Sequence, residues 1–262
     1  MFFDTHSHIH FAQHFPDVEE LIERALETEV THQMIVGCTP KDSFQALDFV
    51  KLQAQKGRPN FWSTLGVHPH SANEWTPVVE KRFEELATSE PRIKALGELG
   101  LDYFRNLQPP ELQKKAFAGQ LQLALKLDLP VIIHVREAWD DALAMLQNMG
   151  NTKVILHCFT GTLEQATICW ERGYYLSFSG VITYPKNEYL REVAAQAPLE
   201  KMLLETDCPY LPPQSYRGKR NEPAYIVETA KELARIRNMA FEDIGEQTTK
   251  NAQKIFQLGH SL

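Results

Sequence analysis

Short apolar runs in this sequence end, again and again, on a histidine or a carboxylate. The histidines close the segments 2–8, 131–134 and 154–157, and carboxylates close the segments 95–98 and 202–207. The carboxyl ends of the strands in a parallel β-barrel gather at one rim, so side chains distant in sequence meet there. The sequence therefore predicts parallel strands whose ends carry the ligands of a metal ion.

Segments with helical periodicity alternate with these apolar runs along the whole chain. Helices are predicted at 17–28, 41–55, 78–87, 111–127 and 138–149, the last ending at Gly150. Eight strands can be counted, which predicts the α/β class and a single (β/α)8 TIM barrel over residues 1–262. A doubly wound open sheet would show the same alternation. Ligands spread over many strand ends favour the barrel, because an open sheet gathers its site at one switch point.

Composition restricts the class of protein. No run of about 18 apolar residues occurs, so no membrane span is expected, and the N-terminus lacks the pattern of a signal peptide. Four cysteines without a CxxC pair suggest free thiols in the cytoplasm. The formal net charge of −7 argues against a protein that coats nucleic acid with its whole surface, but it does not exclude a nuclease.

Six of the strand-end residues are candidate metal ligands. His6 and His8 are two residues apart on a strand, so both imidazoles should face the same side. His134 and His157 close successive strands, whose backbones lie about 5 Å apart in a parallel sheet. Glu98 and Asp207 would be costly buried charges without a partner. A hydrogen-bonding position beside the ligands is predicted for Glu205 rather than a ligand position.

Four histidines and two acids are more ligands than one tetrahedral ion needs. The count predicts a binuclear centre with ions about 3.5–4 Å apart, which activates water and holds the oxygens of a phosphoryl group. Imidazole suits zinc, manganese or iron, whereas magnesium prefers oxygen ligands, so the metal stays open.

A second group of residues is predicted to face the substrate. His68 and Arg136 follow strands and are positioned to contact an anion, while His70 is interpreted as an exposed loop histidine. One loop after the last strand combines an aromatic ring with three cations, a composition suited to stacking a base and holding phosphates. Its members are Tyr216, Arg217, Lys219 and Arg220.

Taken together, these segments resemble the TatD family of metal-dependent hydrolases, known mainly as deoxyribonucleases. The resemblance implies a TIM barrel of the metal-dependent amidohydrolase type. The resemblance covers essentially the whole chain. It is carried by the segments 3–8, 65–69, 95–103, 129–136, 156–161, 177–180, 204–211 and 217–223.

The resemblance implies a two-metal site and a substrate. His6, His8, Glu98 and Asp207 would hold the first ion, and Glu98 with His134 and His157 would hold the second. The ions would be Mg, Mn or Zn. The implied reaction is hydrolysis of DNA phosphodiesters by metal-activated water, as a 3′–5′ exonuclease on single strands. Asp207 would accept the proton of the water, Glu98 would join it in catalysis, and a monomer is expected.

Two other functions fit parts of the same pattern. The first is hydrolysis of an ester, an amide or an aminoacyl-tRNA ester on the same binuclear centre, because the metal site alone does not select the substrate. Glu98 weighs against the cyclic-amidase type, which uses a modified lysine on the fourth strand. The second is a non-catalytic barrel that binds nucleic acid or a protein, which we disfavour because no ligand is missing.

Overall fold

The computed structural model describes residues 1–149 and 153–258, and the predicted helix end at Gly150 lies outside them. These residues divide into two compact units, which we describe separately. Unit 1 comprises Met1–Ile35 and His157–Leu262, and unit 2 comprises Val36–Leu156. The single domain expected over residues 1–262 stays a prediction.

Unit 1 contains four parallel strands in the order β7-β8-β1-β2. Backbone pairing joins β7 to β8 and β1 to β2, and a parallel bridge links Ser7 to Cys208 beyond β8. Its strands are β1 (Phe2–Ser7), β2 (Val30–Ile35), β7 (Tyr175–Phe178) and β8 (Met202–Leu204). Its α-helices are α1 (Val18–Glu27), α6 (Leu163–Glu171), α7 (Glu188–Gln196), α8 (Ile226–Arg237) and α9 (Phe241–Ile255).

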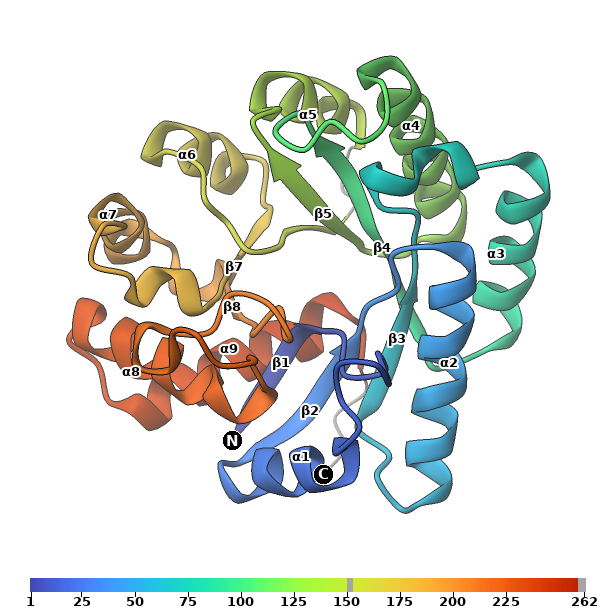
Figure 1. Cartoon of the computed structure of the whole chain (residues 1–262). Helices are drawn as coiled ribbons and strands as arrows, with labels where there is room; N and C mark the ends of the chain where they lie inside the picture. Colours follow the sequence, from blue (N-terminus) through green and yellow to red (C-terminus); the bar gives the residue numbers. More distant parts are fainter. Residues whose placement is uncertain (150–152, 259–262) are drawn as a thin grey trace. The chain divides into compact units, whose positions relative to one another are not determined.

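The C-terminal helix α9 covers strands β1 and β8 in unit 1 (Figure 1). Phe2 and Phe3 on β1 are buried, and their rings lie 5.0 Å from Phe241 and 5.8 Å from Phe256. Such aromatic pairs bury large apolar areas and stabilise the core. The first strand, which carries His6, is therefore anchored by the last helix of the chain.

Unit 2 contains the parallel strands β3-β4-β5-β6 in that order. They are β3 (Phe61–Leu65), β4 (Ile93–Asp102), β5 (Val131–Arg136) and β6 (Val154–Leu156). The α-helices are α2 (Pro40–Gln55), α3 (Pro77–Ser89), α4 (Pro110–Leu127) and α5 (Trp139–Leu146). Helix α2 begins where Thr39 Oγ1 accepts a hydrogen bond from Asp42 N–H, with Pro40 in its first turn.

Within the described residues, eight parallel strands alternate with helices along the chain. This confirms the fold class expected from the sequence, the α/β class of the (β/α)8 type. None of the helices among residues 1–149 and 153–258 combines the length and the apolar composition that crossing a bilayer requires.

One glycine in β4 allows the closest approach between β4 and β5. Gly100 pairs with His134 and has φ +143°, and a Cβ at this position would lie 2.0 Å from the His134 carbonyl oxygen. No side chain fits that space without a backbone shift. The distance between Glu98 on β4 and His134 on β5 therefore depends on the absence of a side chain at Gly100.

We expect Gly100→Ala to lower the free energy of unfolding by about 3 kcal/mol, because a forbidden backbone angle and an overpacked contact act together. Gly57→Ala is the matched control: its φ is +79°, but a Cβ there meets nothing within 4 Å, so about 1 kcal/mol is expected. Urea denaturation of both variants measures the difference. Equal losses would show that the contact with His134 costs nothing.

Candidate metal centre

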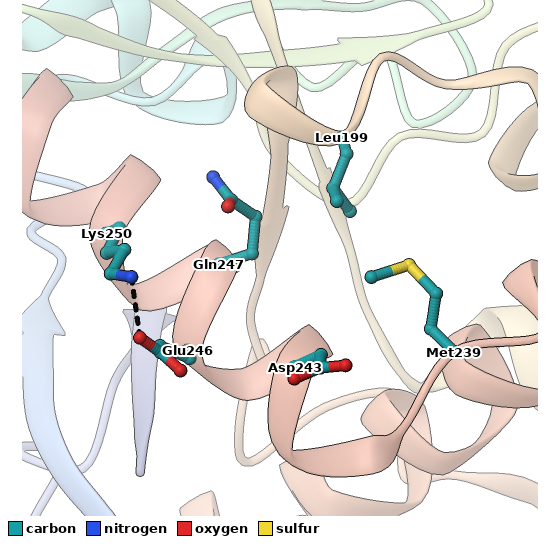
Figure 2. Close-up of a pocket in the computed structure, with 6 residues that line it drawn as sticks. All are labelled: Leu199, Met239, Asp243, Glu246, Gln247 and Lys250. Atoms are coloured by element: carbon teal, nitrogen blue, oxygen red, sulfur yellow. Dashed lines mark hydrogen bonds and ion pairs between the residues drawn. The ribbon is translucent and has the colours of Figure 1, made fainter.

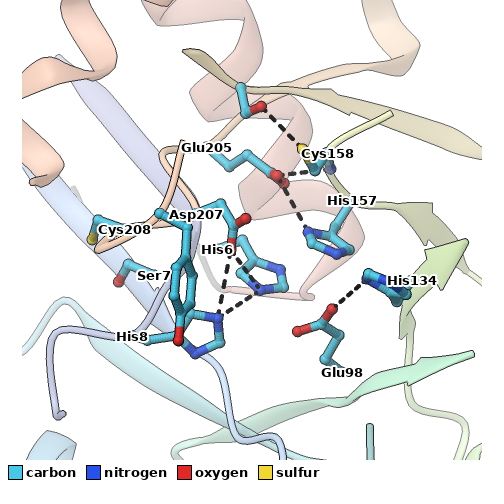
Figure 3. A network of polar contacts seen from close by, with 12 residues as sticks. His6, Ser7, His8, Glu98, His134, His157, Cys158, Glu205, Asp207 and Cys208 are labelled. Atoms are coloured by element: carbon cyan, nitrogen blue, oxygen red, sulfur yellow. Dashed lines mark hydrogen bonds and ion pairs between the residues drawn. The ribbon is translucent and has the colours of Figure 1, made fainter. Parts of the chain in front are cut away.

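In unit 1, three donor atoms converge at the carboxyl end of β1. His6 Nε2 and His8 Nε2 lie 3.2 Å apart, and Asp207 Oδ1 lies 3.7 Å from the first and 3.6 Å from the second (Figure 3). All three residues are buried. The expectation that the two imidazoles face the same side of the strand is confirmed.

The segment after β8 carries Asp207 in a conformation that few residues adopt. Asp207 has φ +59°, in the left-handed region that asparagine and aspartate enter more readily than most residues. Its N–H donates to the His6 carbonyl oxygen at 2.9 Å. Buried Asn221 donates from Nδ2 to the carbonyl oxygens of Thr206 and Tyr210 at 2.8 and 2.6 Å. These bonds fix the Asp207 carboxylate beside the two histidines.

A second carboxylate, Asp4, supports this segment from β1. Its oxygens accept hydrogen bonds from the backbone N–H and the hydroxyl of Thr206 and from His6 N–H. Burial raises the pKa of Asp4 to about 7, although these hydrogen bonds act in the opposite direction. Asp4 therefore ties β1 to the segment after β8.

The three donor atoms in unit 1 fit a divalent cation. Ligand atoms about 2.0–2.1 Å from a tetrahedral ion lie roughly 3.3 Å from one another, close to the observed separations of 3.2–3.7 Å. Two imidazole nitrogens at 3.2 Å need a proton or a cation between their lone pairs. Imidazole and carboxylate together are the donor set of zinc and manganese sites.

His157 stacks on His6, with ring centroids 4.0 Å apart. Its Nδ1 lies 3.3 Å from Oε1 of Glu205, which is fully buried and accepts a hydrogen bond of 2.7 Å from Cys158 N–H (Figure 3). A carboxylate on one nitrogen of an imidazole fixes the ring orientation and raises the basicity of the other nitrogen. Glu205 therefore lies beside Nδ1, which leaves Nε2 of His157 as the candidate metal-binding atom.

In unit 2, Glu98 lies between two histidines. Its Oε1 is 2.8 Å from His134 Nδ1 and 3.3 Å from His68 Nε2, and its Oε2 accepts a contact of 3.6 Å from Cys38 Sγ. The carboxylate and both imidazoles are close enough to hold one ion. His68, which we expected to contact the substrate, thus belongs to the same cluster as Glu98.

Asp102 is a buried residue of this cluster that the sequence analysis missed. Its Oδ2 lies 3.3 Å from His134 Nε2 and 2.8 Å from His70 Nε2, and its Oδ1 accepts a hydrogen bond from Arg105 N–H. Burial favours the protonated form, yet these contacts hold its pKa well below the usual range. Asp102 is thus a charged carboxylate that orients His134, leaving Nδ1 toward Glu98.

Two expectations need correction in unit 2. Glu98 and His134 do not end their strands, since β4 continues to Asp102 and β5 to Arg136. The ladder extends because Asp102 pairs with Arg136 and Tyr103 N–H donates to the Arg136 carbonyl oxygen. His70 is only partly exposed and contacts Asp102, so its interpretation as an exposed loop histidine was wrong.

The residues expected to bind substrate make the following contacts. The exposed Arg136 guanidinium lies 3.9 Å from the ring centroid of Phe104, which is 54% exposed. In unit 1, Tyr216 stacks on Tyr225 at 3.6 Å. The Arg217 guanidinium lies 4.5 Å from the Tyr184 ring, Lys219 Nζ lies 5.5 Å from the Tyr216 ring, and Arg220 pairs with Asp17 at 2.6 Å. Their contact with substrate stays a prediction.

A separate surface pocket of about 240 Å³ lies in unit 1 (Figure 2). Its lining residues are Leu199, Met239, Asp243, Glu246, Gln247 and Lys250. Lys250 Nζ donates to Glu246 at 2.6 Å. Because the lining contains no histidine or cysteine, this pocket does not offer the donor set found around His6.

Comparison with known proteins places the whole chain in one family. Residues 3–257 match the family described as TatD related DNase. A Bacillus subtilis protein named uncharacterized metal-dependent hydrolase YabD is 37% identical, over 98% of this chain and 100% of the relative. The protein of Salmonella typhimurium named 3′-5′ ssDNA/RNA exonuclease TatD is 35% identical, over 98% and 99%.

A solved structure supports the same grouping. The crystal structure of the TatD homologue YjjV from Escherichia coli K12 superimposes with a TM-score of 0.90. Its sequence is 28% identical, and the match covers 98% of each chain. Sequence identity and superposition of the folds therefore group this chain with the same relatives.

The buried His68 generates a pH prediction. Burial lowers the pKa of His68 to about 4, although the Glu98 carboxylate acts to raise it. Between pH 4 and the ordinary value near 6.5, the unfolded chain binds a proton that the folded chain does not. The stability of metal-free protein should therefore rise with pH across this window by as much as about 3 kcal/mol.

Urea denaturation of chelator-treated wild type and His68→Gln at several pH values between 4 and 7 measures this effect. In His68→Gln, the increase in the free energy of unfolding with pH that His68 contributes should be absent. The same pH dependence in both proteins would contradict a neutral, buried His68.

Proposed function

The chain belongs to the TatD family of metal-dependent hydrolases, and from that premise we propose that it cleaves the phosphodiester bonds of single-stranded DNA from the 3′ end. The proposed substrate and polarity are supported by the relatives, one of which is named a 3′-5′ ssDNA/RNA exonuclease. The chain itself is a metal-dependent hydrolase. We also propose the cytoplasm as its location and a monomer as its state.

The observation that carries the proposal is the convergence of His6, His8 and Asp207. Three buried donor atoms of two different chemical types, 3.2–3.7 Å apart, are costly to assemble without a cation. A structural zinc site would use four protein ligands, whereas a catalytic site keeps a position for water. The three donors that unit 1 supplies leave at least one further position on the ion.

We propose two divalent ions, Mg, Mn or Zn. His6, His8 and Asp207 would hold one ion, and Glu98 and His134 would hold the other. The sharing of Glu98 between both ions and the participation of His157 rest on the family resemblance. When bound, such ions lower the pKa of a coordinated water and neutralise charge that develops on phosphoryl oxygens.

The side chains have separate tasks in the proposed reaction. Asp207 Oδ1 faces the two imidazoles, so we assign its Oδ2 to the proton of the attacking water, and Glu98 assists as the second catalytic carboxylate. Arg136 and His68 would hold the phosphate. Binding of the strand is assigned to the loop of Tyr216, Arg217, Lys219 and Arg220.

Asp207→Asn should remove most of the activity, because the amide cannot accept the proton and is a weaker ligand. We expect a loss of roughly 100-fold or more in kcat/KM. The measurement is time-resolved digestion of 5′-end-labelled single-stranded DNA with added magnesium or manganese. The wild type should give a ladder that shortens from the 3′ end.

Asp243→Asn is the matched control, since this aspartate lies on α9 in the same unit and is exposed. It should digest DNA like the wild type. Near-normal turnover by Asp207→Asn would refute the assignment of Asp207. No cleavage of DNA or RNA by a metal-loaded wild type would redirect the search to ester and amide substrates.

A further inference from the structure

In unit 1, Phe11 and Tyr210 contact the buried candidate ligand His8, and His14 contacts both of them. We call Phe11, His14 and Tyr210 the aromatic rim. Phe11 stacks on His8 with ring centroids 5.0 Å apart and an interplanar angle of 8°. Tyr210 meets His8 edge-on at 6.2 Å. His14 lies 6.1 Å from Phe11 and 6.5 Å from Tyr210, which closes the circuit of rings.

The rim leads from the buried donor atoms to solvent. His8 is buried, Phe11 is half-buried, His14 is exposed and the Tyr210 ring is 49% exposed. Packing alone gives no reason for an aromatic ring to stay half in water beside a cluster of metal ligands. The exposed parts of these rings can be reached by a flat ligand.

The backbone of the rim is fixed at each of its three members. Phe11 N–H donates to the His8 carbonyl oxygen at 3.0 Å, and His14 N–H donates to that of Phe11 at 2.8 Å. The Arg220 guanidinium donates to the His14 carbonyl oxygen at 2.8 Å, and Tyr210 N–H donates to that of Asp207 at 2.9 Å. A ligand that stacks here therefore meets a segment whose backbone is already ordered, which reduces the entropy lost on binding.

A nucleobase is the flat group that a nucleic acid carries beside each phosphate. Every base has a π-face, so stacking on an aromatic side chain tolerates any sequence. In a duplex the faces are covered by neighbouring pairs, whereas an unpaired base can be splayed out onto a protein ring. The rim would therefore select single strands without selecting a sequence.

We propose that the aromatic rim is a stacking subsite for one unpaired base of the strand whose phosphate reaches His8 and Asp207. The inference deepens the proposed function and rests on it. It assigns substrate contacts to Phe11, His14 and Tyr210, which lie outside the cationic loop considered above.

The test is the affinity for a short oligothymidylate with hydrolysis-resistant phosphorothioate links, measured by fluorescence anisotropy with manganese present. Tyr210→Leu should raise Kd by roughly 5- to 150-fold, the range for loss of one stacked base. Tyr210→Phe should keep wild-type affinity. The matched control is Tyr189→Leu, since Tyr189 is 44% exposed in the same unit, and it should bind normally.

Abasic substitution separates stacking from a structural effect. Bases near the 3′ end are replaced one at a time by an abasic analogue. At one position, the abasic analogue should weaken binding by the wild type as much as Tyr210→Leu weakens binding of the intact strand. At that position the abasic analogue should not weaken binding by Tyr210→Leu any further. His14→Ala, at an exposed position where misfolding is not expected, should show the same pattern with a smaller change.

An unchanged Kd in Tyr210→Leu would overturn the subsite. An increase in Kd that is equal for intact strands and for every abasic strand would overturn it as well. Cleavage of ordinary DNA without base-dependent binding would overturn the subsite and leave the proposed activity standing. Base-dependent binding without cleavage would support the subsite and refute the proposed activity.

Discussion

Burial of imidazole and carboxylate groups against one another is the constraint on which both units depend. In unit 1, His6, His8 and Asp207 are buried together, and in unit 2 the buried Glu98 contacts the half-buried His134. Removing a charge from water costs several kcal/mol unless partners compensate for it. A divalent cation supplies that compensation, so the groups that make each cluster costly to fold are those that make it a strong metal site.

Residues outside the clusters hold the donor atoms in place. Asp102 orients His134, Glu205 lies beside His157, and Asn221 fixes the segment that carries Asp207. The same buried asparagine also holds the carbonyl oxygen of Tyr210. Ligand geometry and the aromatic rim thus share one support, which ties the position of a bound base to the position of the attacked phosphate.

Local periodicity made part of this structure predictable. The spacing of two between His6 and His8 placed both rings on one side of β1, because side chains alternate along a strand. The same rule applies to Asp102, four residues beyond Glu98, but the predicted strand ended too early. The contact of His14 with Tyr210 joins opposite ends of the chain, and no periodicity within one segment encodes such a pairing.

The most direct test of the account is the number of ions each chain binds. Chelator-treated protein is loaded with zinc or manganese, dialysed and analysed by elemental mass spectrometry, beside His8→Ala and His134→Ala. We predict about two ions per chain in the wild type and about one in each variant. A wild type that retains no metal, or variants that retain as much as the wild type, would contradict the assignment of these clusters as metal sites.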